Sequence, residues 1–182
     1  NDAPVIEDIA SQEMDEDTTL DITLSASDVD DGTGSGDESD LSFSAESDNT
    51  AISVSVTDDQ LTITPELDYY GSGTITVTVT DMGSRLEDET SFDVTVNNVN
   101  DAPVLTDIGP QSTDEETSIT ALSVNFTDSD IYDPSDTHTI TVESSSPSDV
   151  VVQNLSGDVS GSTYDLVPLT DFHGDVEITV TV

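Results

Sequence analysis

Hydrophobic and polar residues alternate strictly along several segments of the chain. Residues 74–80 read Thr-Ile-Thr-Val-Thr-Val-Thr, and shorter runs with the same period lie at residues 51–56, 61–64 and 92–96. Because successive side chains of a strand point to opposite faces, this period in β-branched residues predicts strands with one buried face. Gly, Pro and Asp clusters separate the runs, and no segment follows the 3.6-residue period of a helix. The density of roughly seven short strands per hundred residues predicts an all-β sandwich.

An internal repeat organises the chain. The pentapeptide Asn-Asp-Ala-Pro-Val at residues 1–5 recurs at residues 100–104. Further matches follow in order: Glu16 with Glu115, Asp28 with Asp128, Asp30 with Asp130, Asp68 with Asp171, and Gly71 with Gly174. A fixed period of this length predicts tandem domains, which we place at residues 1–99 and 100–182. We expect the short junction before Pro103 to hold the two domains end to end.

The second repeat is shorter than the first at its end. The first continues beyond Val79 into a further alternating run at residues 91–99, whereas the second ends at Val182, the counterpart of Val79. The sequence therefore predicts that the second sandwich lacks its last strand. Two explanations remain open: a longer repeat array is cut at this point, or another chain supplies the strand by β-augmentation.

The charge of the chain limits its partners. Asp and Glu number 41 against one basic residue, Arg85, which gives a net charge near −40. Such a polyanion is repelled by nucleic acid and by anionic membrane surfaces, and no apolar run is long enough for membrane insertion. The absence of Cys and Lys excludes disulfides, zinc–thiolate sites, Schiff-base chemistry and a P-loop. Low aromatic content with high charge is also typical of disorder, but the strict alternation argues for a folded chain.

Clustered carboxylates with no basic residues to offset them indicate a divalent cation. Ca²⁺ takes six to eight oxygen ligands and tolerates irregular loops. Asp28-x-Asp30 and Asp128-x-Asp130 each follow a predicted strand, and side chains two residues apart in extended chain point the same way. A solubilising or halophilic surface is the alternative, and it accounts for most of the 41 acidic residues. The Asp/Gly-rich loop at residues 30–37 is a weaker calcium candidate, since its spacing differs from that of an EF-hand.

These motifs, in this order, resemble the cadherin-type repeats found in tandem in large bacterial surface adhesins. Asp28-Val29-Asp30 resembles the family's DxD motif, Leu67-Asp68-Tyr69-Tyr70 resembles its LDRE motif in the aspartate alone, and residues 98–103 resemble its DxNDNAP linker. Residues 67–70 match the LDRE motif only at Asp68, and residues 98–103 match the DxNDNAP motif only in part. We therefore expect fewer ions per junction than in animal cadherins.

The resemblance implies which residues bind Ca²⁺. The inter-domain junction would use Glu16, Asp68, Asn98, Asn100, Asp101, Asp128 and Asp130. Half of a site shared with an upstream domain would consist of Asn1, Asp2, Asp28, Asp30 and Asp81. Half of a downstream site would consist of Glu115, Glu116 and Asp171.

The resemblance also implies a function: a calcium-stiffened extender or adhesion module, extracellular or on the bacterial cell surface, with a role in adhesion and biofilm. Its partners would be neighbouring repeats of the same chain, with glycans or self-association as further possibilities. A calcium-dependent carbohydrate-binding module and an accessory domain of a polysaccharide-degrading enzyme are the alternatives. We expect no catalysis, because His138 and His173 accompany no nucleophile motif. Tyr69, Tyr70 and Phe172 are interpreted as core or corner residues rather than a sugar-stacking platform.

Overall fold

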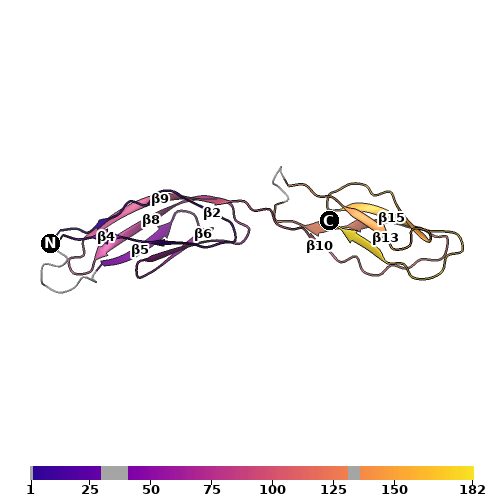
Figure 1. Ribbon diagram of the computed structural model, residues 1–182, viewed down its shortest axis with the longest axis horizontal. Helices are drawn as coiled ribbons and strands as arrows, with labels where there is room; N and C mark the ends of the chain where they lie inside the picture. Colours follow the sequence, from indigo (N-terminus) through magenta and orange to yellow (C-terminus); the bar gives the residue numbers. More distant parts are fainter. Residues whose placement is uncertain (1, 30–40, 131–135) are drawn as a thin grey trace. The chain divides into compact units, whose positions relative to one another are not determined.

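A computed structural model describes residues 2–29, 41–130 and 136–182, and this part of the chain is all-β, with strands, turns and no helix. It divides into two compact units, Asn1–Val99 and Asn100–Val182. Figure 1 shows the strands of both units. The predicted fold class is confirmed, and the alternating runs at residues 51–56, 61–64, 74–80 and 92–96 all fall largely within strands.

Unit 1 contains two main sheets and a short strand pair. The first sheet has the order β2-β9-β8-β5, with β2 parallel to β9, and the second has the order β3-β7-β6. β1 pairs with β4. The strands are β1 (Val5–Ile6), β2 (Gln12–Asp15), β3 (Leu20–Thr23), β4 (Ala26–Ser27), β5 (Leu41–Ser47), β6 (Ile52–Thr57), β7 (Gln60–Pro65), β8 (Gly71–Asp81) and β9 (Glu87–Asn97).

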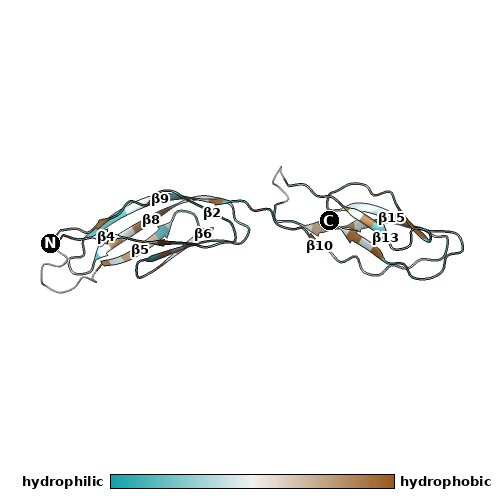
Figure 2. Ribbon diagram, in the orientation of Figure 1, coloured by the Kyte–Doolittle hydropathy of each residue, from teal (hydrophilic) through white to brown (hydrophobic). Residues whose placement is uncertain are grey.

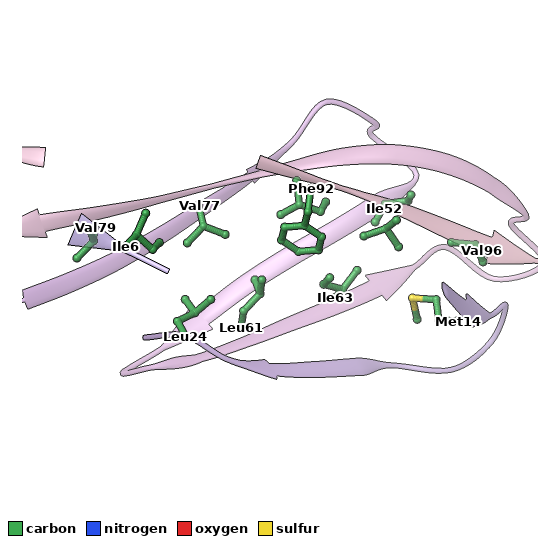
Figure 3. Close-up of a cluster of buried hydrophobic side chains, with 12 residues drawn as sticks. Ile6, Met14, Leu24, Ile52, Leu61, Ile63, Val77, Val79, Phe92 and Val96 are labelled. Carbon is green, nitrogen blue, oxygen red and sulfur yellow. The ribbon is translucent and has the colours of Figure 1, made fainter. Parts of the chain in front are cut away.

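The core of unit 1 lies between its two sheets. Ile75, Val77 and Val79 of β8 are fully buried, while the threonines between them are not. They pack in one cluster with Phe92 of β9 and with apolar residues of β6 and β7, several of which Figure 3 labels. Figure 2 shows the same alternation as bands of hydrophobic and hydrophilic colour along the strands. The period-2 pattern thus places β-branched side chains on the buried face and hydroxyl groups on the other.

Unit 2 repeats this arrangement with fewer strands. One sheet has the order β11-β15-β14, the other consists of β13 and β16, and β10 pairs with β12. The strands are β10 (Val104–Leu105), β11 (Ile119–Val124), β12 (Phe126–Thr127), β13 (Thr141–Ser144), β14 (Val150–Gln153), β15 (Ser162–Pro168) and β16 (Ile178–Thr181). Val124, Phe126, Ile140 and Tyr164 are buried at its centre.

Within the described residues, unit 2 has no counterpart of β9, and this changes two neighbouring segments. β16 hydrogen-bonds to β13 alone, whereas its counterpart β8 lies between β5 and β9. Residues 111–114, the counterpart of β2, form no strand, because β2 pairs only with β9. A cavity of about 880 Å³ lies here, lined in part by Ile108, Tyr164 and Val180. Among the described residues, part of the unit 2 core is therefore open.

The repeated Asp-Tyr-Tyr-Gly and Asp-Phe-His-Gly motifs form the same turn. Asp68 and Asp171 adopt φ of 56° and 59°, and Gly71 and Gly174 adopt φ of 151° and 150°. A Cβ at Gly71 would lie 2.5 Å from the Tyr69 Oη, so this position requires glycine. Tyr69 packs against the core, and its Oη accepts a hydrogen bond from Asn49 Nδ2 at 2.6 Å. The backbone conformation of this turn thus explains why the glycine of the motif recurs in both repeats.

Candidate metal-binding carboxylates

Three acidic residues are buried as whole residues among those that the structure describes, and the side chains of Asp128 and Asp136 are buried as well. Glu16 is 4% exposed, Asp81 is 9% exposed and Asp130 is 3% exposed. Burying a carboxylate is costly unless other groups satisfy its charge, and the sequence offers a single Lys or Arg, Arg85. All three belong to the ligand set expected from the sequence. Burial therefore distinguishes Glu16, Asp81 and Asp130, together with the side chain of Asp128, from the exposed acids of the surface.

Glu16 lies at the end of unit 1 where β9 finishes. It follows β2, and its Oε1 accepts the backbone N–H of Val99 at 2.6 Å. Its own N–H donates to the carbonyl of Asn97 at 3.0 Å. Because β2 runs parallel to β9 with Asp15 opposite Asn97, the next residue of each strand reaches the same end. The parallel pairing thus brings a residue 83 positions away in sequence to the start of the linker.

Asp17 joins this group at the same end of unit 1. Its Oδ1 accepts the backbone N–H of Asp68 at 3.1 Å, and both residues have positive φ, 58° for Asp17 and 56° for Asp68. The exposed Asp17, next to Glu16 in the sequence, thus holds the backbone of Asp68 at this end of unit 1. Sequence reasoning did not include Asp17, although its counterpart in the second repeat, Glu116, was included; applying the offset of 99 (116 − 17) in reverse identifies it.

Asp81 lies at the end of β8 and closes a turn. It accepts backbone N–H groups from Gly83 at 2.8 Å and Ser84 at 3.2 Å, and also the Ser84 hydroxyl. Asp28 follows β4, whose antiparallel pairing with β1 places residues 2–4 and 28 at adjoining chain ends. Asp2 is exposed and Asp28 is half-buried. Asn1 and Asp30, the other members of the predicted upstream half-site, lie outside the described residues, as does the loop at residues 30–37.

The start of unit 2 holds a second connected group. Asp130 Oδ2 accepts the backbone N–H of Asp101 at 2.6 Å, and the Asp130 N–H donates to Asp128 Oδ1 at 3.0 Å. The remaining oxygen of Asp128, Oδ2, lies 2.8 Å from His138 Nε2. This hydrogen bond lowers the pKa of Asp128 below its usual value, against an opposing effect of burial. Asp136 is the second carboxylate near His138 Nε2. The ligands expected from the sequence include neither His138 nor Asp136.

The remaining predicted ligands are less constrained. Asn100 Nδ2 donates to the carbonyl of Asp101 at 2.9 Å, and Asn98 is half-buried. Glu115, Glu116 and Asp171 are exposed. His173 and Tyr70 are also exposed, the latter by 46%. No helix in the described part of the chain has the length and apolar character needed to cross a membrane.

Comparisons with known proteins identify a family for the first repeat. The model of the bacterial Ig domain family matches residues 1–97, a little over half of the chain. A search of curated protein sequences finds no match.

Solved structures offer more distant similarities. Drosophila N-cadherin EC1-4 is 15% identical with a TM-score of 0.48, and the alignment covers 98% of this chain and 45% of that one. An endo-fucoidan hydrolase of glycoside hydrolase family 107 is 14% identical with a TM-score of 0.41, covering 98% of this chain and 28% of that one. Chicken VE-cadherin EC1-2 is 16% identical with a TM-score of 0.31, covering 93% and 86%. The chain thus spans less than half the length of the first two.

Proposed function

This chain belongs to the bacterial Ig domain family, and from that premise we propose that it is a non-catalytic, calcium-binding module of a secreted or cell-surface bacterial protein. In this proposal the module extends an adhesin and supports cell adhesion or biofilm formation. Its direct partners are neighbouring repeats of the same chain. Calcium ions bound by loop carboxylates stiffen the backbone between successive repeats.

One observation carries the proposal: the buried carboxylates coincide with the ligands expected from the sequence. Glu16, Asp81 and Asp130 are buried as whole residues and Asp128 has a buried side chain, and each sits in a loop or at a strand end. The side chain of Asp136, which the sequence did not predict as a ligand, is also buried. Carboxylates that support only solubility would remain solvated, because hydration is their most favourable state. A hard divalent cation stabilises such groups in the folded state, and oxygen donors in irregular loops are what Ca²⁺ accepts.

The backbone of the linker is held by carboxylates at two positions close together in the sequence, which supports an effect of bound calcium on its stiffness. Glu16 binds the N–H of Val99, and two residues later the N–H of Asp101 binds Asp130. Asn100 therefore lies in sequence between two backbone positions that carboxylates hold, with Asn98 just before the first of them and Asp101 at the second. An ion that takes oxygen ligands from these residues would restrict the linker dihedral angles.

Calcium-dependent thermal stability tests the proposal. Extracellular calcium modules bind at roughly 10⁻⁴ to 10⁻³ M. At a concentration about 100 times Kd, each independent site adds about 2.7 kcal/mol to the free energy of unfolding. We expect melting temperatures to rise with Ca²⁺ and to fall in EDTA. Equal ionic strength of NaCl should reproduce only the screening part of the effect. A melting temperature that changes neither with Ca²⁺ nor with EDTA would contradict the proposal.

A matched pair of variants localises the effect. Glu16→Gln keeps an oxygen that can accept the Val99 N–H but removes the buried charge, and should reduce the calcium-induced shift. Glu13→Gln removes the same charge from an exposed position of β2 and should leave the shift unchanged. Equal shifts in both variants would show that calcium acts through general charge screening.

A further inference from the structure

His138 occupies a position in unit 2 that is apolar in unit 1. Ser47 pairs with Ile75 in unit 1, and Ser144 pairs with Ile178 in unit 2. Six residues before these serines lie Leu41 and His138, so the two residues hold the same place in the repeat. Leu41 packs against the core of unit 1. His138 faces inward as well, because its exposure alternates in step with Ile140 and Val142 and its ring lies 4.8 Å from that of Phe126.

Two carboxylates converge on this inward-facing imidazole. His138 Nε2 lies 2.8 Å from Asp128 Oδ2 and 3.3 Å from Asp136 Oδ2. The exposed fractions of the three side chains are 12% for His138, 0% for Asp128 and 8% for Asp136. The three donor atoms all lie within 4.8 Å of one another. One nitrogen and two carboxylate oxygens thus point at a single small volume.

Asp136 supplies an independent sign that a ligand belongs there. Its Oδ2 is buried and has no hydrogen-bond partner among the described residues, although it faces His138. A buried oxygen of this kind is costly unless a cation neutralises it. A proton on His138 would leave the group of three at a net charge of −1, because the two aspartates contribute −2. A divalent cation on a neutral imidazole would bring it to zero, in a chain whose net charge is near −40.

We propose that Asp128, Asp136 and His138 form a binding site for a transition-metal divalent cation, of which Zn²⁺ is the representative. The imidazole nitrogen decides the metal class, because Ca²⁺ takes oxygen ligands whereas Zn²⁺ accepts nitrogen together with carboxylate oxygen. Tetrahedral Zn²⁺ with bonds of about 2.0–2.2 Å separates its donors by roughly 3.3–3.5 Å, and the observed separations of 2.8 and 3.3 Å need only small side-chain adjustments. Water would complete the coordination. Asp128 also belongs to the calcium ligands expected from the sequence, so the two proposals share this residue. Asp136 and His138 belong to the transition-metal site alone.

Zn²⁺ titration calorimetry of the full 182-residue chain tests the inference, run first without Ca²⁺ and again in about 10 mM Ca²⁺ to occupy oxygen sites. We expect one site that weakens by at least about tenfold in His138→Leu. That variant carries the residue that unit 1 has at this position, so it should fold. His173→Leu removes the other, exposed histidine and serves as the matched control, with unchanged affinity. Asp136→Asn should also weaken Zn²⁺ binding, while the calcium-induced melting shift persists in all three variants.

The nitrogen NMR resonances of the imidazoles distinguish metal binding by His138 from a purely structural role of this residue. Zn²⁺ should shift the Nε2 resonance of His138 and leave that of His173 unchanged. Equal Zn²⁺ affinity in the parent and in His138→Leu, or a His138 nitrogen that ignores Zn²⁺, would overturn the inference and leave the histidine as a bridge between two aspartates. Loss of the calcium response alone would contradict only the proposed function.

Discussion

Single side chains in this chain fix backbone conformations that the strands alone would not hold. Asp165 of β15 accepts the backbone N–H of Ala121 at 2.9 Å and the Nδ2 of Asn154 at 2.6 Å. Ala121 and Asn154 both adopt φ of 57°, a conformation that is unfavourable for alanine and better tolerated by asparagine. Ala121 lies where the register between β11 and β15 shifts. One carboxylate therefore secures a bulge in β11 and a turn after β14.

The same contacts predict a pH-dependent contribution from Asp165. The hydrogen bond from Asn154, and secondarily that from Ala121, lower the pKa of Asp165 below its usual value of 3.8. A lowered pKa in the folded state means that the stabilisation is present above pH 3.8 and is lost as pH falls through the folded pKa. Asp165→Asn should therefore lower the melting temperature of unit 2 at about pH 6, by a margin that shrinks towards about pH 3.

Comparison with an exposed aspartate separates this effect from general acid unfolding. Asp175→Asn removes the same charge from an exposed loop position. Its melting difference from the parent should stay small across the same pH range. A penalty for Asp165→Asn that persists undiminished at low pH would show that the carboxylate charge plays no part.

Among the elements, β8 and β16 show how much one neighbouring strand matters. Ile75 and Val77 of β8 are fully buried, whereas their counterparts in β16, Ile178 and Val180, are partly exposed and line the cavity of unit 2. The sequences of the two strands are nearly the same, so the difference comes from β9, which covers and pairs with β8. The alternating pattern specifies a strand, but the adjacent strand determines how well that strand is buried.

This difference predicts unequal stability of the two strands. Ile75→Ala should cost about 2–5 kcal/mol in the free energy of unfolding, as expected for a fully buried side chain. Ile178→Ala should lower the free energy of unfolding clearly less, because the Ile178 side chain already contacts an open cavity.

Amide hydrogen exchange should be faster along β16 than along β8. Raising the protein concentration should slow exchange in β16 if chains pair through this edge. Equal protection of both strands in a strictly monomeric sample would contradict this account.

At the scale of the whole chain, each of the two units has its own hydrophobic cluster. The charge of −40 opposes compaction, and few basic residues offset it. We therefore expect the proposed cation binding by linker and loop oxygens to restrict the linker.

Replacing linker ligands should change the range of conformations rather than the fold. Asp101→Asn with Asp130→Asn should leave both units folded but broaden the distribution of distances between spin labels placed one on each unit, in the presence of Ca²⁺. The pair Asp59→Asn and Asp175→Asn removes the same charge from exposed positions and should behave as the parent does. A distribution equally narrow in all three proteins, with or without EDTA, would show that covalent geometry around Pro103 sets the linker.

Local patterns determined the strands, the repeat and the fold class, because side-chain alternation and turn residues act over a few positions. The resemblance to cadherin-type repeats included Glu16, Asp81 and Asp130 in a larger set of expected ligands, without distinguishing them from the others. Tertiary structure alone decided which acids are buried, because the contact of Glu16 with Val99 depends on pairing between distant strands. It likewise turned His138 inward, between Asp128 and Asp136, since the direction of a side chain depends on the register of its strand.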